Sequence, residues 1–409
     1  MRRIFILTAG MMVILVTSSW LLQQNRKRSD YLRFLEIIDV GISLKNPRPV
    51  YASSIFSDIR YIELESTEEI YIRGIRDVKV SGDNIIVVTN RHEILRFNKG
   101  GKFVNSIGRP GRGPGEYNTP FVISILEKQQ KLALLETGAG NRLHLFGLDG
   151  KNPVLVKTPG YCSDVTGFGD NLLLWSLIVQ TPLLENHSAC IIDMRGKVAG
   201  YLLPKVDNVP LKPPFISLGS IEMYRMSDSL SVWEANIDTL YRIENKNTAF
   251  PRYVIRAGKD YLTYARRMST NDSDRSLRNR SVYFNGLIET KQWIFLSSRV
   301  KGEQGYFIYS KKDKQVTFLE PLSLLDGMVK YNGIMNDIDG GPVFWPMGRF
   351  SETELYFTGR FNSYRSHFSR IAKIPDPFRY NEARHKELAE KVSNSDPNDN
   401  PCIVVVRLK

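Results

Sequence analysis

Apolar and polar residues alternate along most of this 409-residue chain in short runs. Between Asp77 and Gly108 four of these runs, DVKV, NIIVVT, EILRFN and FVNSIG, are separated by turns of Gly, Asn and Lys. The runs are rich in β-branched and aromatic residues, which is typical of β-strands. Four strands in about thirty residues is the content of one β-propeller blade, so the pattern predicts an all-β protein built from small sheets.

The same strands return at a spacing close to fifty residues. In the segments EILRFNKGGK, RLHLFGLDGK and ACIIDMRGK the turn glycines are Gly101, Gly150 and Gly196, which lie 49 and then 46 positions apart. The strand before this motif repeats as well, as DNIIVVT, QKLALLE, DNLLLWS, DSLSVWE, KQWIFLS and ETELYFT. Repeats of this length are typical of propellers, and six copies of one strand predict six blades.

The sixth copy has no third strand beside it in the sequence. ETELYFT is followed by apolar residues at helical spacing, at about residues 378–392, and the chain then ends in CIVVVRLK. We expect this terminal strand, 402–408, to pair with RYIELES (Arg60–Ser66), because a ring of sheets is stable when its last edge is paired. The predicted fold is a six-bladed β-propeller over residues 58–409, closed by pairing of its N- and C-terminal strands, with a short C-terminal helix.

The N-terminus differs from the rest of the chain. The 19 residues Ile4–Leu22 carry no charge, and basic residues stand on both sides. Such a run is long enough to cross a bilayer as a helix, and it is equally suited to the apolar region of a secretory signal. Residues 1–25 are thus predicted to be a signal peptide or a membrane anchor, and residues 26–57 a linker. With either alternative the propeller is exported, to the periplasm or cell envelope.

Composition narrows the set of partners. The formal net charge is +13, but no long run of Lys and Arg with interleaved aromatic residues is present. We therefore predict no nucleic-acid partner and allow for an anionic ligand. The five histidines show no HExxH spacing and the three cysteines no CxxC pair, so no metal or cofactor is predicted. Cys162 and Cys190 can form a disulfide in an oxidising compartment or remain buried thiols.

A glycine-rich connection between the first two repeats carries a family resemblance. GRGPGEYNTP followed by KLALLETGAGNRLHLFGLDGK resembles an NHL-type repeat, in which such a turn leaves the outer strand of one blade and a proline enters the next. The whole pattern, including DGGPVFWP (Asp339–Pro346) and the terminal DNPCIVVVRLK, is similar to a family of exported bacterial six-bladed β-propellers. The resemblance spans roughly residues 55–409 and implies the fold and export rather than a particular activity.

The stretch IGRPGRGPGEYNTP raises the question of a phosphate-binding loop. A Walker A loop needs Gly-Lys-Ser/Thr at the start of a helix, whereas here Glu116, Tyr117 and then a strand follow. Gly permits positive φ and Pro restricts the backbone, so the stretch is predicted to be a turn. In propellers this connection lies on the face where ligands usually bind, which makes Arg112 a candidate ligand-binding residue.

The loops between second and third strands share that face. They contain or adjoin the other candidate ligand-binding residues, which are Arg91, Asn141, Arg142, Trp233 and Arg299. Arginines that converge on one funnel favour a carboxylate, a phosphate or a sulfated sugar through bidentate hydrogen bonds, whereas separate loop arginines are simply solvated. Trp233 can stack on a sugar ring or lie buried in its blade.

These observations predict a monomeric binding or scaffold protein of the cell envelope that recognises a protein, peptide or glycan on its loop face. The alternative is a propeller enzyme, a lyase or hydrolase with a metal in the central channel. Some NHL-like propellers are lyases that hold a metal through channel histidines. Here His92 and His144 occupy different positions in their repeats and no nucleophile motif is present, so no catalytic residue is predicted.

Overall fold

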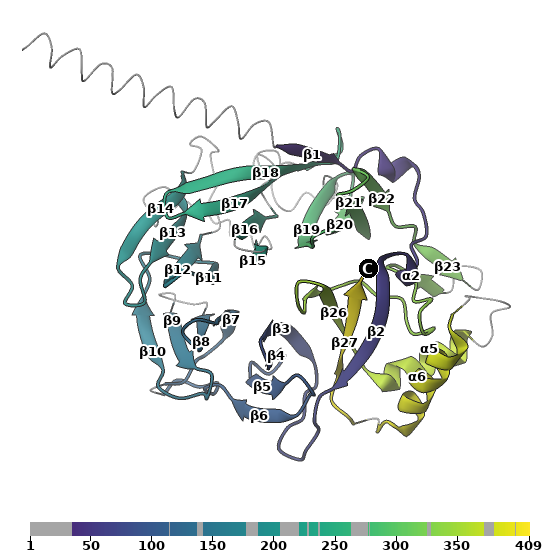
Figure 1. Cartoon of the computed structure of the whole chain (residues 1–409), viewed down its shortest axis with the longest axis horizontal. Helices are drawn as coiled ribbons and strands as arrows, with labels where there is room; N and C mark the ends of the chain where they lie inside the picture. Colours follow the sequence, from purple (N-terminus) through teal and green to yellow (C-terminus); the bar gives the residue numbers. More distant parts are fainter. Residues whose placement is uncertain are drawn as a thin grey trace, which may run out of the picture.

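In a computed structural model the chain forms a ring of six sheets arranged like blades around a central axis (Figure 1). The structure describes residues 35–113, 115–136, 142–176, 187–204, 221–226, 229–235, 238–262, 277, 279–324, 329–371, 380–396 and 398–409. The predicted signal or anchor segment, residues 1–25, and the candidate Asn141 lie outside this part of the chain. The predicted six-bladed β-propeller is confirmed.

Blades I–III follow one another along the chain, and each runs from an inner to an outer strand. Blade I consists of β3 (Ile75–Ser81), β4 (Asn84–Thr89), β5 (Ile94–Asn98) and β6 (Phe103–Ser106). Blade II consists of β7 (Pro120–Leu126), β8 (Lys131–Glu136), β9 (Arg142–Gly147) and β10 (Val154–Lys157). Blade III consists of β11 (Asp164–Phe168), β12 (Asn171–Trp175), β13 (His187–Ile192) and β14 (Val198–Pro204).

Blades IV–VI complete the ring. Blade IV contains β15 (Ile221–Met226), β16 (Ser229–Glu234), β17 (Thr239–Asn245) and β18 (Thr248–Arg256). Blade V consists of β19 (Val282–Glu289), β20 (Trp293–Val300), β21 (Glu303–Ser310) and β22 (Gln315–Phe318). Blade VI consists of β25 (Gly348–Arg349), β26 (Glu354–Gly359), β27 (Cys402–Leu408) and β2 (Phe56–Glu63). A separate two-stranded sheet is formed by β23 (Leu322–Leu324) and β24 (Val329–Tyr331).

Blade VI is built from both ends of the chain, as predicted. Strand β2 runs antiparallel to β27, with the register extending from Phe56 opposite Leu408 to Glu63 opposite Cys402. The side chains of residues 403–406 are at most 1% exposed. An unpaired edge would leave these backbone groups and apolar side chains in water, so the pairing of the two ends closes the ring.

The segment predicted as a linker, residues 26–57, is more ordered than expected from residue 35 onward. Strand β1 (Glu36–Asp39) pairs in parallel with β18 and adds a fifth strand to the outer edge of blade IV. Ile38 and Val40 are buried there. A 3₁₀ turn, η1 (Ser43–Lys45), and a helical turn, α2 (Ala52–Ile55), then lead into β2. These pairings are remote in sequence, and the polar composition of the segment gave no sign of them.

Two helices stand between β26 and β27, beside blade VI (Figure 1). Helix α5 (Phe361–Ile371) was not expected, and α6 (Glu382–Asn394) begins a few residues later than predicted. The side chain of Asn381 caps α6 by accepting a hydrogen bond from the Arg384 amide. Leu388 and Val392 of α6 pack into the core of blade VI. None of the described helices is long and apolar enough to span a bilayer.

The core lies between neighbouring blades. The second strands are its most buried elements, and residues 85–88 of β4 and 132–135 of β8 are 0% exposed. At about 25 cal/mol per Å² of buried apolar surface, these contacts are the main stabilising contribution around the ring. Cys162, Cys190 and Cys402 are buried as thiols, and burial raises the pKa of Cys190 to about 12.

Candidate functional site

The innermost strands of the six blades surround a channel on the axis of the ring. The cavity has a volume of about 1040 Å³ and is lined by residues of β3, β7, β11, β15, β19 and β25. The four strands from the inner to the outer edge of each blade are antiparallel, so every inner strand starts at the end that holds the connections between blades and the turns between second and third strands. We call this end the loop face, and the opposite end the turn face.

Three carboxyl side chains occupy equivalent positions in the part of the channel nearest the loop face. Asp77, Asp164 and Glu222 lie opposite the fifth residue of β4, β12 and β16, respectively. Apolar residues hold the matching positions in the other blades. We call this set of six the acidic ring: Asp77, Val122, Asp164, Glu222, Leu287 and Met347.

A second ring lies two residues further along each inner strand, and all of its members are polar. We call it the polar ring: Lys79, Ser124, Thr166, Tyr224, Glu289 and Arg349. Residues two apart on a strand share one face, so the two rings stack along the channel. The residues between them, such as Val78, Ile123 and Val165, are at most 2% exposed and pack between blades.

Most side chains of the polar ring are bonded to a neighbour in the same ring. Ser124 Oγ donates to Thr166 Oγ1 at 3.4 Å, from blade II to blade III. The Tyr224 hydroxyl donates to Glu289 Oε2 at 2.7 Å, from blade IV to blade V. The Arg349 guanidinium lies 5.8 Å from the centre of the Tyr224 ring. These contacts tie adjacent blades together at the level of the polar ring.

Glu289 is the centre of an ionic network in the channel wall. Its side chain is fully buried, and Arg252 Nη2 donates to Glu289 Oε1 at 2.8 Å. The Lys311 ammonium also pairs with Glu289. Burial, and then the neighbouring Glu289 carboxylate, raises the pKa of Tyr224, which keeps its hydroxyl a donor. The charge of Glu289 is therefore compensated within the fold.

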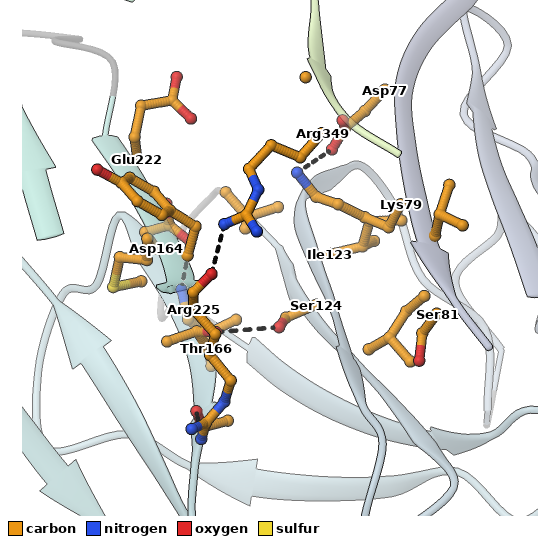
Figure 2. A pocket seen from close by; sticks show the side chains of 18 of the residues that line it. Asp77, Lys79, Ser81, Ile123, Ser124, Asp164, Thr166, Glu222, Arg225 and Arg349 are labelled. Carbon is orange, nitrogen blue, oxygen red and sulfur yellow. Dashed lines mark hydrogen bonds and ion pairs between the residues drawn. The ribbon is translucent and has the colours of Figure 1, made fainter. Parts of the chain in front are cut away.

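The carboxyls of the acidic ring have fewer partners. Lys79 Nζ lies 3.2 Å from Asp77 Oδ2, as drawn in Figure 2. Asp164 Oδ1 accepts from the backbone amide of Val165 at 2.6 Å. Burial raises the pKa of Asp164 to about 7 and that of Glu222 to about 8, although the Lys79 ammonium opposes both shifts. Near neutral pH these two groups can donate as well as accept hydrogen bonds.

The mouth of the channel on the loop face is shaped by β-bulges. The register between β7 and β8 shifts between Pro120 and Val122, which leaves Phe121 as the extra residue. A bulge redirects the side chain of its extra residue. Phe121 lines the cavity and is 36% exposed. The same shift in β3 releases Arg76, whose guanidinium donates to the Pro120 carbonyl.

The candidate arginines lie at the loop-face end of the blades but outside the channel lining. Arg91 is exposed in the turn between β4 and β5, and Arg112 is exposed in the connection between β6 and β7. Arg142 is exposed at the start of β9. Arg299 is exposed in β20, and its Nη1 donates to the Gly302 carbonyl at 3.4 Å. No described contact joins these four side chains.

Trp233 is only 1% exposed and belongs to the core between blades IV and V. Its ring is therefore not available to stack on a ligand in this structure. Of the two alternatives for Trp233, the structure has the one in which the side chain is buried in its blade. The corresponding Trp175 of blade III is buried as well, and its Nε1 donates to Glu234 Oε2 at 2.8 Å.

The glycine-rich connection is a turn held by its own side chains. Glu116 accepts from the Gly113 amide at 2.7 Å and pairs with Arg109 Nε at 2.6 Å. The Tyr117 hydroxyl accepts from the Ile94 amide at 3.1 Å and anchors the turn to blade I. A Walker A loop leaves its backbone amides free to bind phosphate, whereas here the Glu116 carboxylate accepts from the Gly113 amide.

The inner strands, which supply the site, were not among the sequence-predicted binding residues. Their signal is a polar residue two positions after an acidic one, just before a repeated second strand. It occurs at Asp77 with Lys79 and at Asp164 with Thr166. Such short patterns are common on exposed strands, so only the register across blades distinguishes them.

The described residues contain no group of three or more His, Cys, Asp or Glu side chains arranged to hold a metal ion. His144 is buried in blade II with its Nε2 3.4 Å from Glu136 Oε2. His92 lies in the turn between β4 and β5 with a φ of 69°. The three acids of the acidic ring thus face the channel as separate side chains rather than as a metal site.

Comparison with known proteins places this architecture in a family. The chain matches the family described as Domain of unknown function (DUF4934) over residues 35–407. No curated protein matches the chain.

Several solved structures are similar to this chain. A Bacteroides fragilis NCTC 9343 protein described as exported has a TM-score of 0.68 and 16% identity, over 92% of this chain and 99% of that chain. A DUF4221 family member from Bacteroides vulgatus has a TM-score of 0.48 and 10% identity, over 87% and 97%. Virginiamycin B lyase from Staphylococcus aureus has a TM-score of 0.37 and 13% identity, over 73% and 81%. The first similarity shows the fold alone, and nothing about function is inferred from the other two.

Proposed function

This chain belongs to the DUF4934 family, and we propose that it is an exported binding or scaffold protein whose ligand enters the propeller channel from the loop face. The ligand is a protein segment, a peptide or a glycan of the cell envelope. In this proposal residues 1–25 serve as signal peptide or anchor, the protein acts as a monomer, and the first repeats are NHL-like. The description of the Bacteroides fragilis structure as exported supports this location.

The acidic ring is the observation that carries the proposal. A folded protein ordinarily pairs or solvates its carboxyls, yet Asp164 and Glu222 line the channel as half-buried groups, and burial opposes their ionisation. Groups of this kind in a concave pocket mark binding or catalytic sites more often than structural positions. Because six rigid blades position them, they form a preorganised binding surface.

A second candidate is a lyase or hydrolase. The raised pKa values of Asp164 and Glu222, about 7 and 8, suit a general acid and base working near neutral pH. This alternative requires that a bound molecule leaves chemically altered. Glu222→Gln would then retain the ligand and release it unaltered, whereas the wild type would release a product.

Filling the channel tests the binding proposal. Thr166→Trp places an indole in the polar ring, and Leu155→Trp, on the outer strand β10 where Leu155 is 62% exposed, is the matched control. Immobilised full-length proteins are incubated with envelope extract, and the retained molecules are identified by mass spectrometry. We expect the wild type and Leu155→Trp to retain a common set that Thr166→Trp loses.

Variants of the loop-face arginines test whether the ligand binds outside the channel instead. If Thr166→Trp retains the same molecules as the wild type, the channel is not the binding site. If in addition the double reversal Arg91→Glu/Arg299→Glu abolishes retention, the ligand is anionic and binds on the loop face outside the channel. Thermal unfolding of each variant shows whether a loss of retention reflects a loss of fold.

A further inference from the structure

We propose that the channel takes a neutral, polyhydroxylated ligand, a glycan, with one sugar ring packed on Phe121 and its hydroxyls bonded to the acidic ring. This inference rests on the proposed function and adds the chemical class of the ligand. Three features of the mouth support it: an exposed aromatic ring, acids on the adjacent blades and apolar residues in the same ring as these acids.

Phe121 lies in the blade between two blades that carry acids. It belongs to blade II, and the acidic-ring members of the adjacent blades I and III are Asp77 and Asp164. The bulge that redirects Phe121 lies directly before Val122, the blade II member of the acidic ring. An aromatic ring that is 36% exposed at a cavity mouth is free to pack on a ligand. The mouth therefore offers a flat apolar surface on blade II, with a carboxyl on each of the two adjacent blades.

This combination matches the amphipathic surface of a sugar. A pyranose ring presents C–H groups on its faces and hydroxyls around its edge, and each hydroxyl both donates and accepts. An ionised carboxyl accepts from hydroxyls, and a protonated one also donates. Val122 and Met347 add apolar surface to the acidic ring, so both kinds of sugar surface find a counterpart, whereas Leu287 is buried in the core. Below it, Ser124 and Thr166 add hydroxyls that serve either role.

The charges in the wall disfavour an anionic ligand. The Lys79 ammonium pairs with Asp77 at 3.2 Å. Arg225 Nη2 donates to the Gly167 carbonyl at 3.2 Å, and Arg349 donates to the Arg225 carbonyl. Arg349 Nε is buried without a hydrogen-bond partner in the described structure, so it is a donor that the oxygen of a sugar hydroxyl can use. An anion at the mouth would instead meet the three carboxyls of the acidic ring.

The wall also disfavours a cationic ligand. Lys79 already brings a fixed positive charge to the acids, and its ammonium opposes protonation of both Asp164 and Glu222. An incoming ammonium would meet that charge. A neutral ligand meets neither penalty. The volume of about 1040 Å³ lies at the upper end of ligand pockets, which gives room for several sugar units.

The test is calorimetry with purified full-length protein and defined probes. The neutral probes are gluco-, manno-, galacto- and xylo-oligosaccharides of about four to six units. The charged probes are oligogalacturonate, spermidine and trilysine. We expect at least one neutral oligosaccharide to bind and Phe121→Ala to weaken it at least about tenfold. Leu155→Ala, an exposed apolar truncation on the outer strand of the same blade, leaves the affinity unchanged.

A second pair of variants tests the acids. Glu222→Gln keeps the shape of the side chain and is expected to weaken the same oligosaccharide several-fold, whereas Glu244→Gln, on the exposed side of β17 in the same blade, has no effect. Failure of every neutral probe to bind overturns the inference. So does binding that is indifferent to Phe121→Ala, or tight binding of spermidine or trilysine that depends on Glu222.

These outcomes separate the inference from the proposed function. If Thr166→Trp abolishes retention from envelope extract but the retained molecules are peptides or amines, the channel is a binding site and the glycan assignment is wrong. If Thr166→Trp changes nothing in that assay, the proposed function itself is wrong.

Discussion

The two rings of the channel wall differ in how their charges are compensated. In the polar ring Glu289 meets Arg252, Lys311 and Tyr224, and Ser124 meets Thr166. In the acidic ring only Asp77 has a cation partner in the described structure, while burial raises the pKa of Asp164 and of Glu222. One ring therefore uses its polar groups to join blades, and the other keeps them available for a ligand.

This contrast separates structural from functional polarity in a wall built from equivalent strands. A buried charge that is fully paired contributes little beyond holding its partners in place, but it becomes strongly destabilising when one partner is lost. A carboxyl that burial keeps close to neutral destabilises the fold slightly when ionised, and a ligand can relieve that penalty. Substitutions in the two rings should therefore change stability in opposite directions.

The largest effect is expected at Glu289. Glu289→Ala leaves Arg252 and Lys311 without their shared carboxylate, and the free energy of unfolding should fall by about 3–5 kcal/mol. Urea denaturation monitored by tryptophan fluorescence measures this change. Glu244→Ala, an exposed acid on β17, should shift it by less than about 0.5 kcal/mol. Similar stability for both variants would remove the distinction between the rings.

The next effect is a pH dependence that originates in the acidic ring. The folded pKa values of Asp164 and Glu222, about 7 and 8, lie above the ordinary values of about 4. Between about pH 4 and pH 8 the folded state then binds more protons than the unfolded state, so these groups lower the free energy of unfolding as the pH rises. The double substitution Asp164→Asn/Glu222→Gln removes this decrease in the free energy of unfolding.

The difference between this double variant and the wild type is what should be measured. Relative to the wild type, the variant should gain several kcal/mol of unfolding free energy from pH 4 to pH 9, because both pKa values rise by about three or more on folding. Denaturant titrations at several pH values give this difference directly. The exposed pair Asp83→Asn/Glu244→Gln should show no such trend. If this difference in unfolding free energy does not change with pH, the acidic ring titrates like ordinary surface carboxyls.

The smallest effect is expected at Ser124. Its hydroxyl makes a single long hydrogen bond to Thr166, at 3.4 Å, so Ser124→Ala should lower the free energy of unfolding by less than about 1 kcal/mol. The melting temperature provides the measurement, with Ser57→Ala, at an exposed serine of β2, for comparison. A loss above about 2 kcal/mol would show that the hydroxyls, and not only Glu289, join the blades at this level.

The fold was predictable because it depends on patterns that recur. Six copies of a strand such as DNIIVVT bury the same face in every blade, and burial of apolar surface does not depend on which neighbour supplies the contact. The sixth copy has no third strand after it in the sequence, so residues 402–408 were predicted to fill that position. Their pairing with β2 follows from the need to close the ring, and the structure confirms it.

Other parts of the fold were not predictable in this way. Strand β1 pairs with β18 across more than two hundred residues, from Glu36 to Tyr253, and four residues leave no periodicity to recognise. Helix α5 has a mixed sequence, and it packs Phe361 and Tyr364 into the core of blade VI, which stabilises it beyond its intrinsic propensity. In both cases tertiary contacts decide the local structure.

The candidate site shows the same division between what the sequence predicts and what tertiary contacts decide. The arginines at positions 91, 112, 142 and 299 were chosen from their place in loops, and the structure puts them on the expected end of the blades. It does not bring them together. The acidic ring arises from Asp77, Asp164 and Glu222, of which successive members are about ninety and about sixty residues apart. Strand register alone brings them onto one channel wall.

By itself, the amino-acid sequence determined the number of blades, the alternation that buries each second strand and the joining of the two chain ends, because these follow from repeated hydrophobic burial. The tertiary structure alone decided which polar side chains meet in the channel, where a bulge turns Phe121 toward its mouth, and which acids are held away from a compensating cation. The physical reason is that burial is a property of each residue pattern, whereas electrostatic environment is a property of where distant residues come together.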